Sequence, residues 1–348
     1  MIMARVLSVE EFIKRAESLP LLDVRSPGEY AQAHIPGALS LPLFNDEERA
    51  IVGTLYKKQG KIISVQKGLE IVGPKLKGFT KFALKLDSPE ILMHCWRGGM
   101  RSSSMAWLME SVGLKVYLLE GGYKAYRKFV LDSFKNPLKI ILIGGYTGSG
   151  KTELLQLLKA KGEQILDLEG LANHKGSAFG ALGQPIQPRT EQFENMLQKE
   201  IASLDYNRPV WVEDESRNVG KVFLPQPFWD QMRSSPLVRI DTPYEIRLAR
   251  LMRDYACFDI DGLVASIKKI EKRLGYDKCK KALDACNDGD RESAARICLD
   301  YYDAAYGNQL DTRFGNKEEL PSVTMESLDG KTTVEELLSI VKKITFKE

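Results

Sequence analysis

Hydrophobic positions in this chain fall mainly into short unbroken runs that alternate with stretches of helical periodicity. In the N-terminal part, residues 20–24 and 91–94 form apolar runs typical of strands buried on both faces. Residues 103–109 and 125–131 repeat apolar side chains at helical spacing. Strands that alternate with helices predict an α/β domain with a mostly parallel sheet.

A second α/β pattern follows. The run Lys139–Ile143 (KIILI) predicts a buried strand, and glycines and a helix over 153–158 come after it. Further strands are predicted at 209–212 and 237–240. From about residue 244 onward the pattern becomes helical and charged.

These patterns suggest how the chain is divided. Its 348 residues are enough for two or three domains. The polar segment Asp132–Pro137 ends in proline, which indicates a boundary. We expect an α/β domain over 1–134, a second α/β domain over 135–245, and a helical C-terminal region over 246–348.

Composition restricts the class of protein. Hydrophobic residues make up 43% of the chain and charged residues 28%, as in soluble globular proteins. No run approaches the roughly 20 apolar residues that span a bilayer, and the N-terminus lacks a signal-peptide layout. We therefore expect a cytoplasmic protein with no membrane partner. The five cysteines are scattered without a CxxC pair, which argues against a disulfide framework or a zinc site.

Charge leaves a nucleic-acid partner open. The net charge of +3 excludes a broadly basic coat. Residues 245–282 nevertheless hold ten Lys and Arg against six Asp and Glu, and Arg247, Arg250 and Arg253 recur at three-residue spacing. That helix could contact an RNA backbone or could simply be solvated.

The segment His94–Ser103 (HCWRGGMRSS) carries the first candidate chemistry. Cys95 follows a predicted strand and precedes a predicted helix, where backbone N–H groups and the helix N-terminus favour negative charge. Arg97 and Arg101 add positive charge. These features predict a lowered pKa and a thiolate nucleophile at Cys95; the alternative is a small buried hydrophobic residue. The predicted catalytic residues are Cys95 and Arg101, and the predicted oxyanion loop is Trp96, Arg97, Gly98, Gly99 and Met100.

The segment Gly145–Thr152 (GYTGSGKT) fits the GxxxxGK[ST] phosphate loop, between a strand and a helix. Its amides and Lys151 are expected to bind two phosphates, and the Thr152 hydroxyl could bind Mg²⁺. Asp214, after the strand at 209–212, is the predicted acidic partner, although a solvated turn is the alternative. The phosphates could belong to a nucleotide or to another diphosphate. The predicted phosphate-binding residues are Gly145, Gly148, Ser149, Gly150, Lys151 and Thr152.

Three motifs of the N-terminal domain resemble those of rhodanese-like domains: LDVRSPGEY at 22–30, HIPGA at 34–38 and LEGGY at 119–123. In that family Asp23 and His34 are mainly scaffold. The loop from Cys95 to Arg101 has the form Cys-x5-Arg, longer than in common rhodaneses and similar to cysteine-dependent phosphatases. This length implies a bound oxyanion larger than a bare sulfur atom.

A rhodanese-like domain followed by a phosphate-loop domain resembles the tRNA 2-selenouridine synthase family. Segments 53–57, 167–180 and 213–217 also resemble that family. The resemblance implies geranylation of a wobble 2-thiouridine in tRNA by geranyl diphosphate, then replacement of the sulfur by selenium from selenophosphate. Cys95 would carry selenium as a perselenide or attack the selenium donor, Arg101 and the loop amides would bind the donor's phosphate, and the phosphate loop would bind geranyl diphosphate. No tightly bound cofactor is expected, and the oligomeric state stays open.

Other interpretations fit parts of the chain. The Cys-x5-Arg loop also suits a phosphatase with a regulatory phosphate-loop domain. A rhodanese-type sulfurtransferase and a phosphate-loop kinase or ATPase with an inert rhodanese module are further alternatives. Trp96 could stack on a flipped base or could be a packing residue. His174 could be functional or structural.

Overall fold

The computed structural model describes most of the chain. The described residues are 4–255, 258–314, 319–328, 330–342 and 344. Their contacts separate two compact units, Met1–Ser133 with Glu194–Lys199, and Phe134–Phe193 with Glu200–Glu348. The division between Ser133 and Phe134 lies beside the predicted boundary at 134/135.

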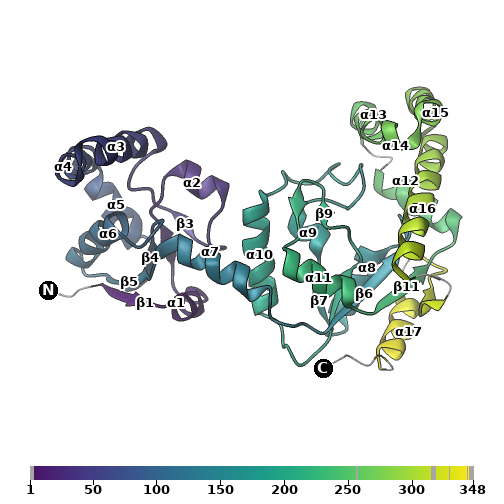
Figure 1. Ribbon diagram of the computed structural model, residues 1–348, viewed down its shortest axis with the longest axis horizontal. Coiled ribbons are helices and arrows are strands. Elements are labelled where there is room, and N and C mark those ends of the chain that lie inside the picture. Colours follow the sequence, from purple (N-terminus) through teal and green to yellow (C-terminus); the bar gives the residue numbers. More distant parts are fainter. Residues whose placement is uncertain (1–3, 256–257, 315–318, 329, 343, 345–348) are drawn as a thin grey trace. The chain divides into compact units, whose positions relative to one another are not determined.

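The first unit is built on a five-stranded parallel sheet in the order β1-β5-β4-β2-β3 (Figure 1). The parallel α/β architecture predicted from the sequence is confirmed. The strands are β1 Arg5–Leu7, β2 Leu21–Asp23, β3 Leu39–Ser40, β4 Glu90–His94 and β5 Lys115–Leu119. The helices are α1 Val9–Ala16, α2 Pro27–Gln32, α3 Asp46–Gln59, α4 Lys61–Val72, α5 Leu76–Leu84, α6 Met100–Ser111 and α7 Gly122–Ser133, with a 3-10 turn at Gly73–Lys75.

The central strands of this sheet bring the candidate nucleophile to its carboxyl edge. β2 and β4 are almost wholly buried, which explains why their sequences are continuous apolar runs. Cys95 follows the last residue of β4 directly, and α6 begins at Met100. Ligands of open α/β sheets bind at this edge, beyond the carboxyl ends of the strands.

The second unit contains another five-stranded parallel sheet, in the order β12-β11-β6-β8-β7. Its strands are β6 Ile140–Gly145, β7 Gln164–Leu166, β8 Val210–Glu213, β11 Leu237–Asp241 and β12 Ser322–Thr324, and β9 Asn218–Val219 pairs with β10 Val222–Phe223 in a separate antiparallel hairpin. Its helices are α8 Lys151–Ala160, α9 Leu168–Ala172, α11 Gln226–Ser234, α12 Tyr244–Tyr255, α13 Ile260–Lys269, α14 Glu271–Leu274, α15 Tyr276–Asn287, α16 Arg291–Phe314 and α17 Lys331–Val341. The remaining helix, α10 Thr190–Ala202, is divided, because Glu194–Lys199 belong to the first unit and its two ends to the second.

The region 246–348 contributes to this sheet as well as forming helices. β12 pairs with β11, and α17 packs against α8. Val323, Val334 and Leu337 join the same core cluster as Leu154 and Leu155 of α8. A separate apolar cluster lies among α13, α15 and α16. The predicted helical region therefore completes the phosphate-loop unit: β12 pairs with an edge of β11 that would otherwise be exposed, and α17 adds apolar side chains to the core.

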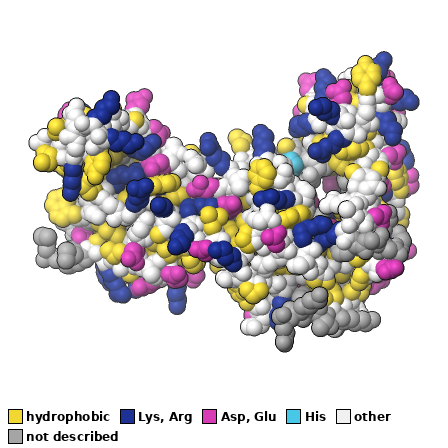
Figure 2. Space-filling view, in the orientation of Figure 1, with side chains coloured by type: hydrophobic (Ala, Val, Ile, Leu, Met, Phe, Trp, Pro, Cys, Tyr) yellow, Lys and Arg dark blue, Asp and Glu magenta, His cyan; other side chains and the backbone are white. Residues whose placement is uncertain are grey.

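The surface is mixed in charge. On the face shown in Figure 2, Lys and Arg side chains are interspersed with Asp and Glu over both units. Throughout the described part of the chain, every helix is too short or too polar to cross a lipid bilayer.

Candidate active site

The Cys95 loop is held by hydrogen bonds from the start of α7. The N–H groups of Tyr123 and Lys124 donate to the carbonyl oxygens of Cys95 and Trp96, at 2.8 and 3.0 Å. Cys95 is only 2% exposed and is the first residue after β4. The loop between the buried strand β4 and helix α6 is thus held by two backbone hydrogen bonds from α7.

Gly122 makes this close approach feasible. It has φ +61°, and a Cβ there would lie 2.5 Å from both the Cys95 carbonyl oxygen and the Gly98 nitrogen. Gly98 itself has φ +68°, in the left-handed region that favours glycine. The LEGGY motif, which the sequence related to rhodanese-like domains, therefore contacts the nucleophile loop directly.

Local donors promote ionisation of the Cys95 thiol. Burial raises its pKa, but hydrogen bonds from the Ser102 hydroxyl and from the N–H groups of Ser102 and Arg97, together with the charge of Arg101, outweigh burial and hold the pKa below its ordinary value. The Ser102 hydroxyl oxygen lies 3.1 Å from Cys95 Sγ and is buried. Thiolate character is the property that a nucleophilic cysteine needs.

The predicted cationic ligand Arg101 is engaged by a carboxylate. Arg101 Nη1 lies 2.7 Å from Glu29 Oε2, and Arg49 lies 3.8 Å from the same oxygen. Burial opposes ionisation of Glu29, yet the hydrogen bonds and charge of Arg101 lower its pKa. Glu29 thus orients the guanidinium at the loop. Arg97 and Met100, by contrast, are exposed.

The Trp96 ring packs beside Tyr123 and Arg25. Its half-buried ring lies 5.7 Å from the Tyr123 ring, and the Arg25 guanidinium is 5.8 Å from the indole. Asp23 and Arg25 form a buried ion pair at 2.6 Å, which fits the expected scaffold role of Asp23.

The second candidate site surrounds the phosphate loop. Gly150 has φ +87° and precedes α8, so the loop turns sharply into the helix as the motif predicts. Lys151 Nζ donates to the Gly145 carbonyl oxygen at 3.0 Å. Arg250 donates to the Gly148 carbonyl oxygen at 2.7 Å, and its guanidinium packs where a Cβ on Gly150 would lie.

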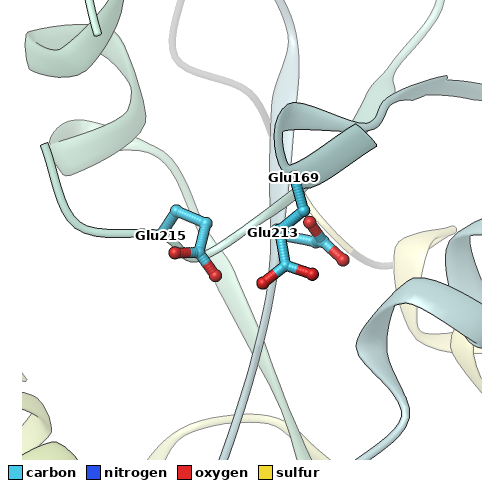
Figure 3. A group of neighbouring side chains, drawn as sticks. All are labelled: Glu169, Glu213 and Glu215. Carbon is cyan, nitrogen blue, oxygen red and sulfur yellow. The ribbon is translucent and has the colours of Figure 1, made fainter. Parts of the chain in front are cut away.

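Three glutamates converge beside this loop. Carboxylate oxygens of Glu169, Glu213 and Glu215 lie within 4.8 Å of one another, and Figure 3 shows the Glu169 and Glu213 groups side by side. The Thr152 hydroxyl lies 2.8 Å from Glu213 and 3.1 Å from Glu169. Burial, and then the neighbouring carboxylates, raise the pKa of Glu213 well above its ordinary value. Burial and Glu169 raise the pKa of Glu215 to about 8.

The predicted acidic partner Asp214 has other neighbours. It forms an ion pair with Arg313 at 2.7 Å and accepts a hydrogen bond from the Tyr306 hydroxyl at 3.3 Å. Glu213, the last residue of β8, faces Thr152 instead. Successive side chains at a strand end point in opposite directions, so the choice between 213 and 214 depends on register, which the sequence left open.

The three arginines of α12, for which RNA contact and a solvated face were both left open, are buried at two of the three positions. Arg247 and Arg250 are 5% and 2% exposed. Arg247 pairs with Asp303 at 2.7 Å, and Arg250 contacts the phosphate loop, so neither can offer an open surface to RNA. Arg253 is half-exposed and pairs with Glu153 and Asp254. The physical reason is that α12 packs with these side chains inward.

The segment 173–180 divides between core and site. His174 is 8% exposed, burial lowers its pKa, and its Nδ1 has no hydrogen-bond partner among the described residues. Lys175, Gly176 and Ser177 line the same cavity as the phosphate loop.

Comparison with known proteins relates both units to one family. A rhodanese-like domain model matches residues 8–129, and the model of the tRNA 2-selenouridine synthase AAA domain matches residues 138–320. A tRNA 2-selenouridine synthase of Nitrosomonas europaea is 41% identical over 68% of this chain and 63% of its own length. The protein of that name from Bdellovibrio bacteriovorus is 43% identical over 69% and 65%. One from a Sulfurovum species is 34% identical over 88% and 94%.

The chain belongs to the tRNA 2-selenouridine synthase family. Its match spans a little less than two thirds of the length of the Nitrosomonas and Bdellovibrio relatives, and nearly all of the Sulfurovum relative. The rhodanese-like domain fused to a phosphate-loop domain is confirmed as the family's arrangement in this chain.

Within this family member, several site residues escaped sequence reasoning. Ser102 belongs to the quoted loop, but nothing in its spacing singled out its hydroxyl. Glu169 and Glu215 lie in segments that resembled the family, yet 46 positions separate them in the sequence. Only folding brings Glu169 to the loop that follows β8.

Proposed function

We propose that this chain converts a wobble 2-thiouridine of tRNA into 2-selenouridine by two transfers, acting as both geranyltransferase and selenotransferase. Family membership supports the RNA substrate and the selenium product. The observation that carries the proposal is a Cys95 thiol of lowered pKa in a Cys-x5-Arg cradle, in the same chain as a phosphate loop.

The first transfer would take place at the phosphate loop. The thiouridine sulfur attacks C1 of geranyl diphosphate; an S–C bond forms, the C1–O bond breaks, and its electron pair leaves with diphosphate while the base loses its N3 proton. Lys151 and the loop amides would stabilise the charge on the leaving group. Alkylation turns a poor leaving group into one that departs as a thiol.

Magnesium fits the carboxylates beside this loop. Glu213 is fully buried, and its Oε2 has no hydrogen-bond partner among the described residues. Carboxylate and hydroxyl oxygens are the ligands that Mg²⁺ prefers. Thr152, Glu169, Glu213 and Glu215 would hold the ion, which would supply positive charge to a bound diphosphate.

The second transfer would use Cys95. Its sulfur attacks the phosphorus of selenophosphate; an S–P bond forms and the P–Se bond breaks, with the electron pair leaving on selenium. Selenide adds to C2 of the alkylated base, and the C2–S bond breaks to release geranyl thiol. Water then cleaves the S–P bond, which yields phosphate and restores the thiol.

This route agrees with the loop. Attack at phosphorus needs no oxidant, whereas moving selenium onto Cys95 as a perselenide requires the loss of two electrons. A Cys-x5-Arg loop is sized for phosphate, and Ser102 stabilises the thiolate that departs when the S–P bond breaks.

The test supplies the purified chain with thiolated tRNA, geranyl diphosphate and selenophosphate, followed by digestion and mass spectrometry of the nucleosides. Wild type should form 2-selenouridine, Cys95→Ser should accumulate the S-geranyl nucleoside, and Lys151→Ala should form neither. Selenium-containing RNA from Cys95→Ser, or labelled geranyl diphosphate bound equally well by Lys151→Ala, contradicts the proposal.

The rival activities give different results in parallel assays. A phosphatase would hydrolyse phosphomonoesters in a Cys95-dependent way and leave tRNA unchanged. A phosphate-loop ATPase would turn over ATP after loss of Cys95. A sulfurtransferase would pass sulfur from thiosulfate to cyanide.

A further inference from the structure

An apolar cavity opens beside the phosphate loop of the second unit. Its volume is about 70 Å³, which is below the range of about 300–1,000 Å³ typical of whole small-molecule sites and suits part of an apolar chain. α12, α13, α15 and α16 contribute its walls (Figure 1). Its apolar lining residues include Met252, Leu263, Ile267, Cys298 and Leu299.

This cavity adjoins the phosphate-loop cavity. Thr147, Ser177, Leu251, Tyr255 and Tyr302 line both. Tyr302 is fixed at this mouth because its hydroxyl accepts a hydrogen bond from the Ala178 N–H at 2.8 Å. A ligand with a diphosphate at one end and an apolar chain at the other would therefore place each end in a matching environment.

The buried thiols in the wall behave as apolar groups. Burial raises the pKa of Cys298 to about 12 and also raises the pKa of Cys286. Both stay neutral at physiological pH and are poor nucleophiles. The cavity thus offers a binding surface without chemistry of its own. Apart from Arg291, the polar residues of the lining also line the phosphate-loop cavity. A purine base held among the apolar residues would leave ring nitrogens without partners, at a cost in binding energy.

We propose that this cavity binds the hydrocarbon chain of the prenyl diphosphate and makes the site selective for chain length. The inference rests on the proposed function, since it assumes that the phosphate loop holds the diphosphate end. Each buried methylene is worth about 0.8 kcal/mol, which is about fourfold in affinity. A ten-carbon chain should therefore bind at least tenfold more tightly than a five-carbon chain.

The test places a larger side chain in the cavity by a substitution in α16. Ala295 lines it and is half-buried, whereas Ala304 is exposed on the same helix and lies outside its lining. Affinities of full-length wild type, Ala295→Phe and Ala304→Phe are measured by calorimetry for geranyl diphosphate, dimethylallyl diphosphate, inorganic diphosphate and ATP. Ala295→Phe should weaken the binding of geranyl diphosphate at least tenfold, while the affinity for inorganic diphosphate stays unchanged. The unchanged affinity also shows that the variant is folded. Ala304→Phe should match wild type.

Four results would overturn the inference. Equal affinity of wild type for the ten- and five-carbon diphosphates would show that the cavity does not bind the hydrocarbon chain. Unchanged geranyl diphosphate affinity in Ala295→Phe, with loss of binding in Lys151→Ala, would reject the cavity and leave the proposed function intact. Weaker ATP binding in Ala295→Phe would place a nucleotide base in the cavity. Absence of geranyl diphosphate binding by wild type would reject the proposed function as well.

Discussion

The Ser102 hydroxyl oxygen lies 3.1 Å from Cys95 Sγ, in the first turn of α6. The Ser102 hydroxyl oxygen also lies 3.1 Å from the Gly99 carbonyl oxygen, so its single proton can go to that oxygen or to the sulfur. When the sulfur is ionised and accepts that proton, the hydroxyl adds to the N–H groups of Arg97 and Ser102. A hydrogen bond to a charged acceptor is worth about 1.5–3 kcal/mol, so this hydroxyl contributes substantially to the reactivity of the thiol.

Replacing Ser102 by alanine should raise the pKa of Cys95, because the thiolate loses a donor and the thiol form does not. The rate of iodoacetamide alkylation at neutral pH should fall several-fold, and its rise with pH should move to higher pH. Ser103→Ala is the matched control, because the Ser103 hydroxyl donates to the Gly99 carbonyl oxygen and is exposed. Identical pH profiles for Ser102→Ala and wild type would remove Ser102 from the account of thiol activation.

Gly122→Ala should displace the nucleophile loop. The new Cβ would clash with the Cys95 carbonyl oxygen and the Gly98 nitrogen, and φ +61° strains any residue with a side chain. We expect destabilisation by at least about 2 kcal/mol and at least tenfold slower selenation, measured by thermal denaturation and nucleoside analysis. Gly78→Ala, in α5 with no atom near its added Cβ, should leave both unchanged or slightly improve stability. Full activity of Gly122→Ala would mean that the loop does not depend on this contact.

The glutamates at the phosphate loop should make stability depend on pH and magnesium. The pKa of Glu215 is raised to about 8 from an ordinary 4.5, so its folded state binds a proton that the unfolded state releases. Stability from this group is full below pH 4.5 and is lost as pH rises toward 8. Without divalent ions, the melting temperature should fall over this window, and Glu215→Gln should flatten the fall. Mg²⁺ should restore stability at pH 8 in wild type. Glu200→Gln, exposed on α10, is the control.

Glu213→Gln and Asp214→Asn should separate two roles at adjacent positions. Glu213 faces Thr152, so its amide variant should weaken magnesium-dependent diphosphate binding at least tenfold. Asp214 pairs with the buried Arg313, so its variant should lower the melting temperature and affect diphosphate binding much less. Calorimetric titration with inorganic diphosphate and Mg²⁺ measures the binding of each variant, and thermal denaturation measures its melting temperature. The reverse order of effects would return the acidic role to Asp214.

Sequence alone determined the features that local chemistry controls. Unbroken apolar runs predicted β4 and β6, and glycines at turns predicted the loops that follow them. Because a strand, a loop and a helix start are contiguous in the chain, Cys95 and Lys151 could be placed at the carboxyl edges of their sheets without a structure. Three short motifs and the order of the two domains pointed to the family.

Tertiary structure alone decided which side chains meet at each site. Packing places Gly122 against the Cys95 loop, turns Arg250 inward beneath Gly150, and brings Glu169 to Glu213. These contacts depend on the register of the strands and on the rotation of each helix about its axis. Both are determined when side chains from distant parts of the chain are buried together. Periodicity indicates that one face of α12 is apolar, but only the packed fold shows that Arg247 and Arg250 lie on its inner side. There Arg247 pairs with Asp303, while Arg250 pairs with Glu153 at 3.4 Å and donates to the Gly148 carbonyl oxygen.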